Sequence, residues 1–155
     1  MKLYKIKKSN IDKKGLYASK DIKCGARIIN YKGKLITNTE VEQNPKFDND
    51  KDIYLFDINK RYSLDGDFSW NTARLINHSC NPNCEVDIID NEIWISSIKR
   101  IKKGDELFYN YGYPFDTDFV DHICKCGSRN CVGYILSDND WHKLKKELKK
   151  KKGKL

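Results

Sequence analysis

The run Asn77-His-Ser-Cys-Asn-Pro-Asn-Cys84 decides how the rest of this 155-residue sequence is interpreted. It places a histidine and two cysteines among residues that favour turns. Two further segments follow it, the strand-like run Glu106-Leu-Phe-Tyr-Asn-Tyr-Gly-Tyr113 and the cluster Cys124-Lys-Cys126…Cys131. Candidate metal ligands and phenols in this order indicate one site assembled from three separated segments.

The length and composition indicate one soluble domain. A chain of this size can bury roughly 70% of its unfolded surface. The first residues contain no continuous apolar stretch, so we expect no secretory signal. No apolar run approaches the ~20 residues that cross a bilayer, so we expect no membrane segment and an intracellular protein.

The six cysteines indicate a metal site more than a disulfide framework, because an intracellular compartment is reducing. Cys124, Cys126 and Cys131 supply three thiolates from one short segment. Zinc prefers four tetrahedral ligands, and a site closed by four thiolates would be structural. The spacing alone leaves the fourth ligand open among five candidates: Cys24, Cys80, Cys84, His78 and His122.

The positive charge lies at the two ends of the chain. Residues 143–154 carry a net charge of +7 and residues 1–14 carry +5, which leaves −4 of the total +8 for residues 15–142. Basic ends favour nucleic acid or another acidic surface, although they could also serve only as solubilising tails. A mildly acidic body suits a basic peptide.

Short apolar runs separated by turn residues predict a mainly β fold with minor helix. Expected strands are 27–31, 53–56, 85–89, 93–98 and 107–113, with breaks at Gly15, Gly25, Gly33, Gly66 and Gly104. We expect a helical turn over 38–42 and a loop over 48–52. The one long helix is predicted at the C-terminus, where Ser137-x-x-Asp140 has the pattern of a capping box and apolar residues recur at helical spacing, namely Trp141, Leu144 and Leu148.

Tyr109, Tyr111 and Tyr113 alternate along the run 107–113, so an extended strand would point all three to one face. Each buried hydroxyl would need a polar partner, whereas Phe or Val would suffice for packing alone. Such a face suits a narrow slot that orients an amine. It would equally suit a surface on which nucleic-acid bases stack.

Together these segments resemble a SET-domain protein lysine methyltransferase with a post-SET zinc module. The run 73–83 resembles the family's segment that contributes to the methyl-donor pocket and to a pseudoknot. The run 103–111 resembles the strand that carries the catalytic tyrosine, and 124–136 resembles the post-SET module. The opening segment of the family is matched by 11–18, 21–22 and 29–33.

The resemblance implies a fold of short β-sheets with a pseudoknot, a C-terminal post-SET zinc loop and a basic C-terminal helix. It divides the chain into a SET domain over 1–113, a post-SET zinc-binding segment over 114–137 and a Lys-rich helix or tail over 138–155. Cys80 is then the fourth zinc ligand beside Cys124, Cys126 and Cys131. Cys24 and Cys84 become ordinary thiols.

The resemblance also implies S-adenosylmethionine (SAM) as cofactor. The positions that match the family's cofactor-binding residues are Asp12, Lys14, Gly15, Tyr54, Asn77, His78 and Lys125. One departure concerns the opening motif, usually Gly-x-Gly, in which Lys13 replaces the first glycine. A positive φ at that position would suit lysine poorly and would lower the affinity for the cofactor.

The activity implied is methyl transfer to the side-chain amine of a lysine in a histone tail or another basic chromosomal protein. Tyr111 matches the catalytic phenol, Tyr109 the position that governs the number of methyl groups, and Tyr113 completes the slot. A phenol at 109 implies mainly monomethylation. The resemblance places the protein in the nucleus or on chromatin in a eukaryotic or viral source, and in the cytoplasm of a prokaryote. The Lys-rich ends could contact nucleic acid.

Two other functions fit parts of the pattern. The first is a zinc-stapled, non-catalytic module that binds chromatin or nucleic acid, which predicts salt-sensitive binding and no affinity for SAM. The second is a SET fold that has lost activity, with Lys13 as the lesion.

Overall fold

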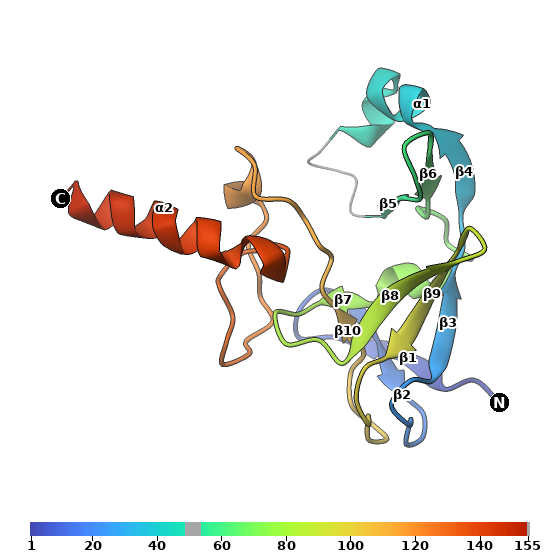
Figure 1. The fold of residues 1–155 in the computed structure, drawn as a ribbon. Coiled ribbons are helices and arrows are strands. Elements are labelled where there is room, and N and C mark those ends of the chain that lie inside the picture. The colour runs from blue at the N-terminus through green and yellow to red at the C-terminus, as the bar shows by residue number, and fades with distance from the viewer. Residues whose placement is uncertain (49–53, 155) are drawn as a thin grey trace.

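The computed structural model describes residues 1–48 and 54–154. Within these ranges small β-sheets form a body from which one helix projects at the C-terminal end (Figure 1). The prediction of a mainly β fold with minor helix is confirmed. The strands are β1 Tyr4–Lys8, β2 Lys14–Ala18, β3 Arg27–Tyr31, β4 Lys34–Thr37, β5 Leu55–Asp57, β6 Tyr62–Asp65, β7 Asn77–His78, β8 Cys84–Ile89, β9 Glu92–Ser97 and β10 Phe108–Tyr109; the α-helices are α1 Asn38–Gln43 and α2 Trp141–Gly153.

The strands pair in four sheets. β1 and β2 form one antiparallel pair, β3-β9-β8 and β4-β6-β5 form three-stranded antiparallel sheets, and β7 pairs with β10 in parallel. Asp90 and Asn91 turn the β8-β9 hairpin with φ of 51° and 63°. These residue types tolerate positive φ well, which suits a two-residue hairpin turn.

One apolar core joins these sheets. Its buried members come from β2, β3, β8, β9 and β10 and from residues next to strands, and they include Leu16, Ile76, Ile95 and Leu107. A separate small cluster contains Phe119, Leu136 and Leu144, and so joins the C-terminal segment to the start of α2.

The parallel pair β7-β10 brings residues 77–78 beside 108–109, thirty-one positions apart. The side chain of Asn83 clasps the same segment, because its Nδ2 donates to the carbonyl of Glu106 (2.8 Å) and its Oδ1 accepts from the amide of Phe108 (2.8 Å). The first two motifs of the sequence are therefore adjacent in space. The predicted pseudoknot stays a prediction.

The predicted strand over 107–113 is mostly wrong, because β10 ends at Tyr109. Beyond it the backbone amides bond to side chains rather than to a neighbouring strand. The amide of Tyr111 donates to Nδ1 of His78 (3.0 Å), and that of Gly112 donates to Oδ1 of Asn110 (2.8 Å). Gly112 has a φ of 70°, which ends the extended conformation.

Other local expectations were wrong or incomplete. Gly15 lies inside β2 instead of breaking a strand. The strands β1, β2, β4, β6 and β7 were not predicted, and β5 begins at Leu55, while most of the expected loop over 48–52 lies outside the described residues. The helical turn over 38–42 is confirmed as α1, where Thr37 and Glu40 form a capping box.

The C-terminal helix is confirmed, but its predicted capping box is wrong. Residues 138–140 form a 3₁₀ turn, and neither Ser137 nor Asp140 caps through its side chain. The carboxylate of Asp140 instead accepts from the amide of Phe115 (3.1 Å) and pairs with Lys143 (2.7 Å). Within the described residues, no helix is long and apolar enough to span a membrane.

Candidate active site and thiol cluster

Asn77 is a buried amide whose nitrogen is fully engaged. Its Nδ2 donates to Oγ of Ser9 (3.1 Å), to the carbonyl of Lys14 (3.2 Å) and to Oε1 of Glu106 (2.9 Å). Among residues 1–48 and 54–154 no donor bonds to its Oδ1, although the side chain is only 7% exposed. Because the nitrogen is held by three acceptors, the amide is fixed with one free acceptor oxygen.

The carboxylate of Glu106 holds the amide of Asn77 in this orientation. Its Oε2 accepts from the hydroxyl of Tyr17 (2.9 Å), while its Oε1 accepts from Asn77. Gly15 lies directly against the same carboxylate, and a Cβ at position 15 would collide with Oε1 of Glu106. A side chain at position 15 would displace this carboxylate, so Gly15 contributes to the site indirectly, by leaving room for Glu106.

Tyr111 is fixed by hydrogen bonds of both its backbone and its side chain. Its backbone amide donates to His78, and its hydroxyl donates to the carbonyl of Ile76 (2.7 Å). Burial raises the pKa of the Tyr111 phenol well above its ordinary value. The phenol is therefore neutral near pH 7, with its O–H donating to the carbonyl of Ile76 and the lone pairs of its oxygen available as acceptors.

His78 joins the tyrosine segment to the cysteines. Burial lowers the pKa of its imidazole to about 4, so the ring is neutral near pH 7. Because Nδ1 accepts from the amide of Tyr111, the ring proton lies on Nε2, which faces Sγ of Cys80 at 3.8 Å. The imidazole is thus a structural bridge with no free nitrogen for proton transfer.

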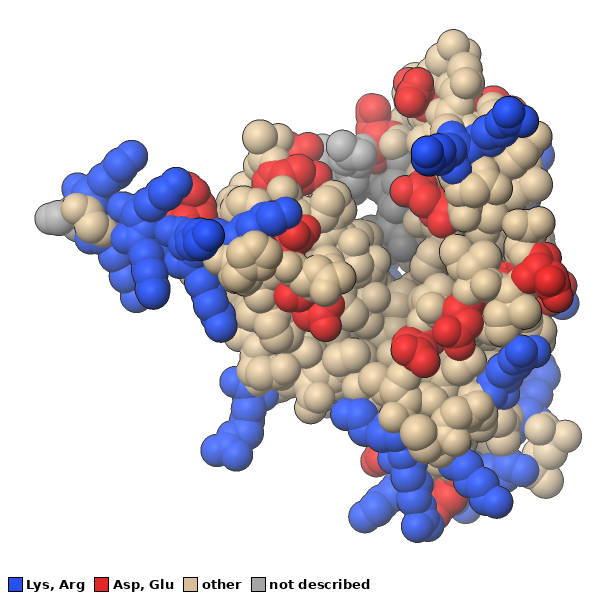
Figure 2. All heavy atoms as spheres, in the orientation of Figure 1, with Lys and Arg blue, Asp and Glu red and all other residues tan. Residues whose placement is uncertain are grey.

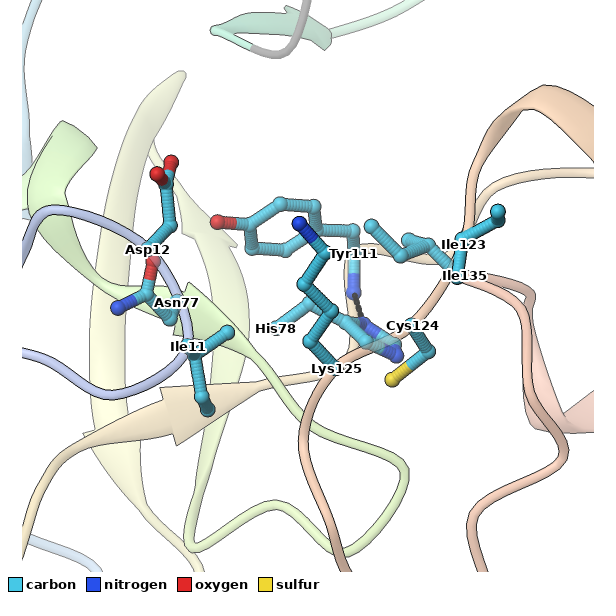
Figure 3. Close-up of a pocket in the computed structure, with 9 residues that line it drawn as sticks. All are labelled: Ile11, Asp12, Asn77, His78, Tyr111, Ile123, Cys124, Lys125 and Ile135. Atoms are coloured by element: carbon cyan, nitrogen blue, oxygen red, sulfur yellow. Dashed lines mark hydrogen bonds between the residues drawn. The ribbon is translucent and has the colours of Figure 1, made fainter.

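A cavity of about 270 Å³ opens beside these groups. Figure 3 shows the ring of Tyr111 crossing it, with the hydroxyl directed toward Asp12 and Asn77 and with Lys125 in front. Ile123 lies at its wall although 62% of this side chain is exposed, so apolar surface remains uncovered there. The lining residues are Ile11, Asp12, Asn77, His78, Tyr111, Ile123, Cys124, Lys125 and Ile135.

The three tyrosines lie in a row despite the short strand. The ring centroids of Tyr109 and Tyr111 are 4.9 Å apart, and those of Tyr111 and Tyr113 are 5.8 Å apart. Tyr113 lines a second cavity, of about 320 Å³, so neighbouring rings of the row border two different cavities. The other residues around the second cavity are Val41, Phe47, Leu55, Asp57, Pro114, Asp116, Asp118 and His122.

The Sγ atoms of Cys80, Cys124, Cys126 and Cys131 all lie within 4.8 Å of one another. Cys80 is 3.8 Å from Cys124 and 3.9 Å from Cys131, sulfur to sulfur. Four ligands about 2.3 Å from a central ion in a tetrahedron would be separated by about 3.8 Å. The cluster therefore has the donor set and the spacing of a closed zinc site.

Protonation within the cluster is uneven. Burial raises the pKa of the Cys80 thiol to about 11. At Cys126 burial acts in the same direction, but hydrogen bonds from Ser128 and from the backbone of Cys80 outweigh it and lower the pKa to about 6. Cys84, whose thiol lies outside the cluster, has its pKa raised to about 12 by burial. At least one thiolate of the cluster is thus available near neutral pH.

A sequence model of the SET domain matches residues 13–112, which contain β7, β10 and most of the tyrosine row. The chain belongs to the SET domain family. This SET domain carries the four-cysteine cluster just beyond the matched region, apart from Cys80, which lies inside it.

Relatives of this SET domain include three histone-lysine N-methyltransferases. Trithorax of Drosophila virilis is 37% identical over 134 residues, which are 83% of this chain and 3% of that protein. Human histone-lysine N-methyltransferase 2D is 37% identical over 130 residues, covering 80% and 2%, and set-2 of Caenorhabditis elegans is 36% identical over 141 residues, covering 86% and 9%. The chain thus spans less than a tenth of the length of these relatives.

The structure brings together most, but not all, of the residues expected at the cofactor site. Asp12, Asn77, His78 and Lys125 line the first cavity with Tyr111. Lys14 and Gly15 lie one layer behind it, where they contact Asn77 through a backbone carbonyl and through close packing.

Tyr54 lies elsewhere. It does not line the first cavity but a separate hollow beside Lys46 and Asp65, and its carbonyl accepts from the hydroxyl of Tyr31 (2.9 Å). Its expected place beside the cofactor rested on the loosest motif match, next to residues outside the described ranges. In this structure it has no contact with that cavity.

Lys13, which stands where the family usually has glycine, has the positive φ expected at that position, 23°. Its carbonyl accepts from the amide of Ser9 (3.3 Å), which closes the turn between β1 and β2. The turn is therefore kept at a strain cost of order 1–3 kcal/mol.

Sequence reasoning missed Ile11, Ile123 and Glu106. The two isoleucines carry no chemical signal, and only the cavity reveals them. Glu106 lies inside a motif that was recognised, but its pairing with Asn77 and Tyr17 depends on contacts distant in sequence.

Proposed function

We propose that this chain is a SAM-dependent protein-lysine N-methyltransferase that mainly monomethylates a histone tail or another basic chromosomal protein. The observation that carries the proposal is the tyrosine row, whose neighbouring members Tyr111 and Tyr113 border two separate cavities. A methyl donor in one cavity and a lysine entering from the other would meet at the row. The relatives named as histone-lysine N-methyltransferases support this assignment.

The first cavity fits SAM in its donor set. The free Oδ1 of Asn77 would accept a hydrogen bond from the donor's ammonium group, and Lys125 offers a cation for its carboxylate. The exposed side chain of Ile123 would cover the adenine ring together with Ile11 and Ile135. SAM, when bound, supplies a methyl group on a sulfonium centre that is open to attack by an amine.

Tyr111 would orient the reacting centre. Its proton is held by the carbonyl of Ile76, so its oxygen presents a lone pair to the cavity. The raised pKa makes the phenol unable to act as a base near pH 7. The target lysine must therefore lose its proton on entering the slot, helped by desolvation, and alignment between the tyrosines lowers the remaining barrier.

Tyr109 would limit the number of methyl groups. Its side chain is 4% exposed, and among the described residues no hydrogen-bond partner of its hydroxyl is present. Burial raises the pKa of this phenol, so it stays neutral. A buried, unpaired hydroxyl next to Tyr111 would hold a water or the amine itself, and it leaves less space for an alkylated amine.

Zinc would fill the thiol cluster as a structural ion. Cys80 and the three cysteines of the C-terminal segment would each supply one thiolate. This ion would fix the wall of the first cavity formed by Cys124 and Lys125. We also propose the division into a SET domain over 1–113, a post-SET segment over 114–137 and a basic helix over 138–155; the small apolar cluster linking Phe119, Leu136 and Leu144 supports a junction between the last two.

The second cavity would receive the substrate peptide. Asp57, Asp116 and Asp118 line it, so its walls favour cationic side chains beside the target lysine. A histone tail has that character, and a nuclear or chromatin-associated location would follow in a cell with a nucleus.

The test is methyl transfer from labelled SAM to core histones, nucleosomes and a basic non-histone extract. Tyr111→Phe should keep the fold and lose most activity, because it removes the hydroxyl alone. Tyr62→Phe, on an exposed tyrosine of β6, is the matched control and should remain active. A fully active Tyr111→Phe would refute its role, and no SAM binding by zinc-loaded protein would favour a non-catalytic binding module.

A further inference from the structure

Within the described residues, helix α2 is anchored only at its first turn. Leu144 is 2% exposed and packs in the cluster with Phe119 and Leu136, and Nε1 of Trp141 donates to the carbonyl of Leu136 (3.3 Å). From residue 145 to 154 every side chain is exposed except that of Glu147, which is half-buried. Figure 1 shows the helix projecting from the body as a free rod.

The free part of α2 is strongly cationic. Residues 143–154 contain eight lysines and one acidic residue, Glu147. In the described part of the chain the one ion pair of these lysines joins Lys143 to Asp140. Figure 2 shows the blue side chains spread along the projecting helix.

The lysines surround most of the helix. At 3.6 residues per turn they cover roughly two thirds of the circumference, and the rest is the stripe of Trp141, Leu144 and Leu148. Beyond the buried Leu144 that stripe offers one apolar side chain, Leu148, which is 41% exposed. A helix that lies on a membrane needs a continuous apolar face, which α2 lacks.

We infer that α2 binds double-stranded DNA by lying in the major groove, where phosphates flank it on both sides. A helix with its side chains is about 10–12 Å across and the groove is about 12 Å wide. Lysines on opposite flanks of the helix can then reach both strands at once. Lysine is a point charge that contacts phosphate without reading bases, so the binding is independent of sequence.

This inference does not depend on the proposed methyl transfer. The competing explanation is that any basic surface of this protein attracts any polyanion. The N-terminal lysines around β1 serve as the control for that explanation. They are Lys5, Lys7 and Lys8, preceded by Lys2, and they lie on a separate part of the body.

The test measures fluorescence anisotropy of a labelled duplex at 50 to 200 mM salt with the full chain and two variants. One variant changes Lys149, Lys150, Lys151 and Lys152 to Gln, and the control changes Lys2, Lys5, Lys7 and Lys8 to Gln. Both remove four charges, and Gln keeps the helix propensity of Lys. Circular dichroism checks that α2 remains helical.

With about six phosphate contacts, the affinity of the unchanged chain should fall about 1,000-fold across this salt range. The α2 variant keeps about two phosphate contacts, so its affinity should fall only about 10-fold over the same salt range. At 50 mM salt it should bind the duplex more weakly than the unchanged chain does. The N-terminal variant should retain the salt dependence of the unchanged chain.

Three results would overturn the inference. Equal weakening by the two variants would show that net charge alone governs binding. Equal affinity for duplex RNA of the same length would exclude the groove, because the RNA major groove is too narrow for a helix. Equal affinity for vesicles of anionic phospholipid, lost in the α2 variant, would assign the helix to membranes.

Discussion

Replacing Glu106 with Ala should lower the free energy of unfolding and, by a second and separately measurable effect, the affinity for SAM. The carboxylate accepts two hydrogen bonds, one from Tyr17 and one from Asn77, both at 2.9 Å. A hydrogen bond to a charged group contributes about 1.5–3 kcal/mol. Both donors keep other acceptors, the carbonyl of Lys8 for Tyr17 and Ser9 with the carbonyl of Lys14 for Asn77, so the lower value applies to each.

The free energy of unfolding should therefore fall by about 3 kcal/mol in Glu106→Ala. For a domain of this size the thermal midpoint should drop by about 6–12 °C. In addition, the amide of Asn77 can turn, which removes its Oδ1 from the cavity. Loss of one hydrogen bond to the donor's ammonium should weaken SAM binding roughly 10-fold.

Thermal unfolding and titration calorimetry with SAM separate the two effects. Tyr17→Phe removes the hydrogen bonds of this hydroxyl to Glu106 and to the carbonyl of Lys8 but leaves Asn77 bonded to Glu106, so it should lower the midpoint by a few degrees and leave the SAM affinity unchanged. Glu106→Gln keeps an acceptor for Asn77 and should restore most of the affinity. If Glu106→Ala lost stability but bound SAM as the unchanged chain does, the argument that Glu106 orients Asn77 would be refuted.

Three further outcomes are expected. Tyr109→Phe should shift the product from monomethyl- toward di- and trimethyl-lysine in mass spectra, because it removes the buried hydroxyl; an unchanged product would contradict this role. Cys80→Ala should release zinc to a chromophoric chelator, whereas Cys84→Ala, whose thiol lies outside the cluster, should retain one ion per chain. Leu144→Ala should cost about 2–5 kcal/mol and speed amide exchange at the start of α2, and Leu148→Ala, at 41% exposed, should not.

The fold was predicted best where a pattern is local. The strands 27–31, 85–89 and 93–98 are short apolar runs bounded by turn residues, and the structure has them within one residue at each end. β1 and β6 were missed although both alternate apolar and polar residues, because each strand is only four or five residues long and has just two apolar members. β10 was overextended because its pattern continues to Tyr113 while side chains of Asn110 and His78 take the backbone amides.

The candidate site was predictable where one residue type carries the chemistry. The structure places Cys80 beside Cys124, Cys126 and Cys131. The spacing of the cysteines left five candidates for this fourth ligand, and only the family resemblance selected Cys80. The cofactor contact expected of Tyr54 stays a prediction, because this side chain borders a hollow separate from the first cavity. Glu106 could not be found from sequence, because its role depends on Gly15 and Asn77 meeting it across the β2-β7 contact.

His78 connects the thiol cluster to the tyrosine row. Cys80 is two residues beyond His78, and the imidazole that faces its sulfur also receives the amide of Tyr111. A bound ion would therefore fix Tyr111 through two successive contacts, as well as the cavity wall at Cys124. Because the C-terminal segment has, within the described residues, only the small cluster around Leu136 as core, we expect it to depend on such an ion for order. Loss of zinc should consequently disorder the cavity before it unfolds the sheets, whose own core at Leu16 and Ile95 lies apart from the cluster.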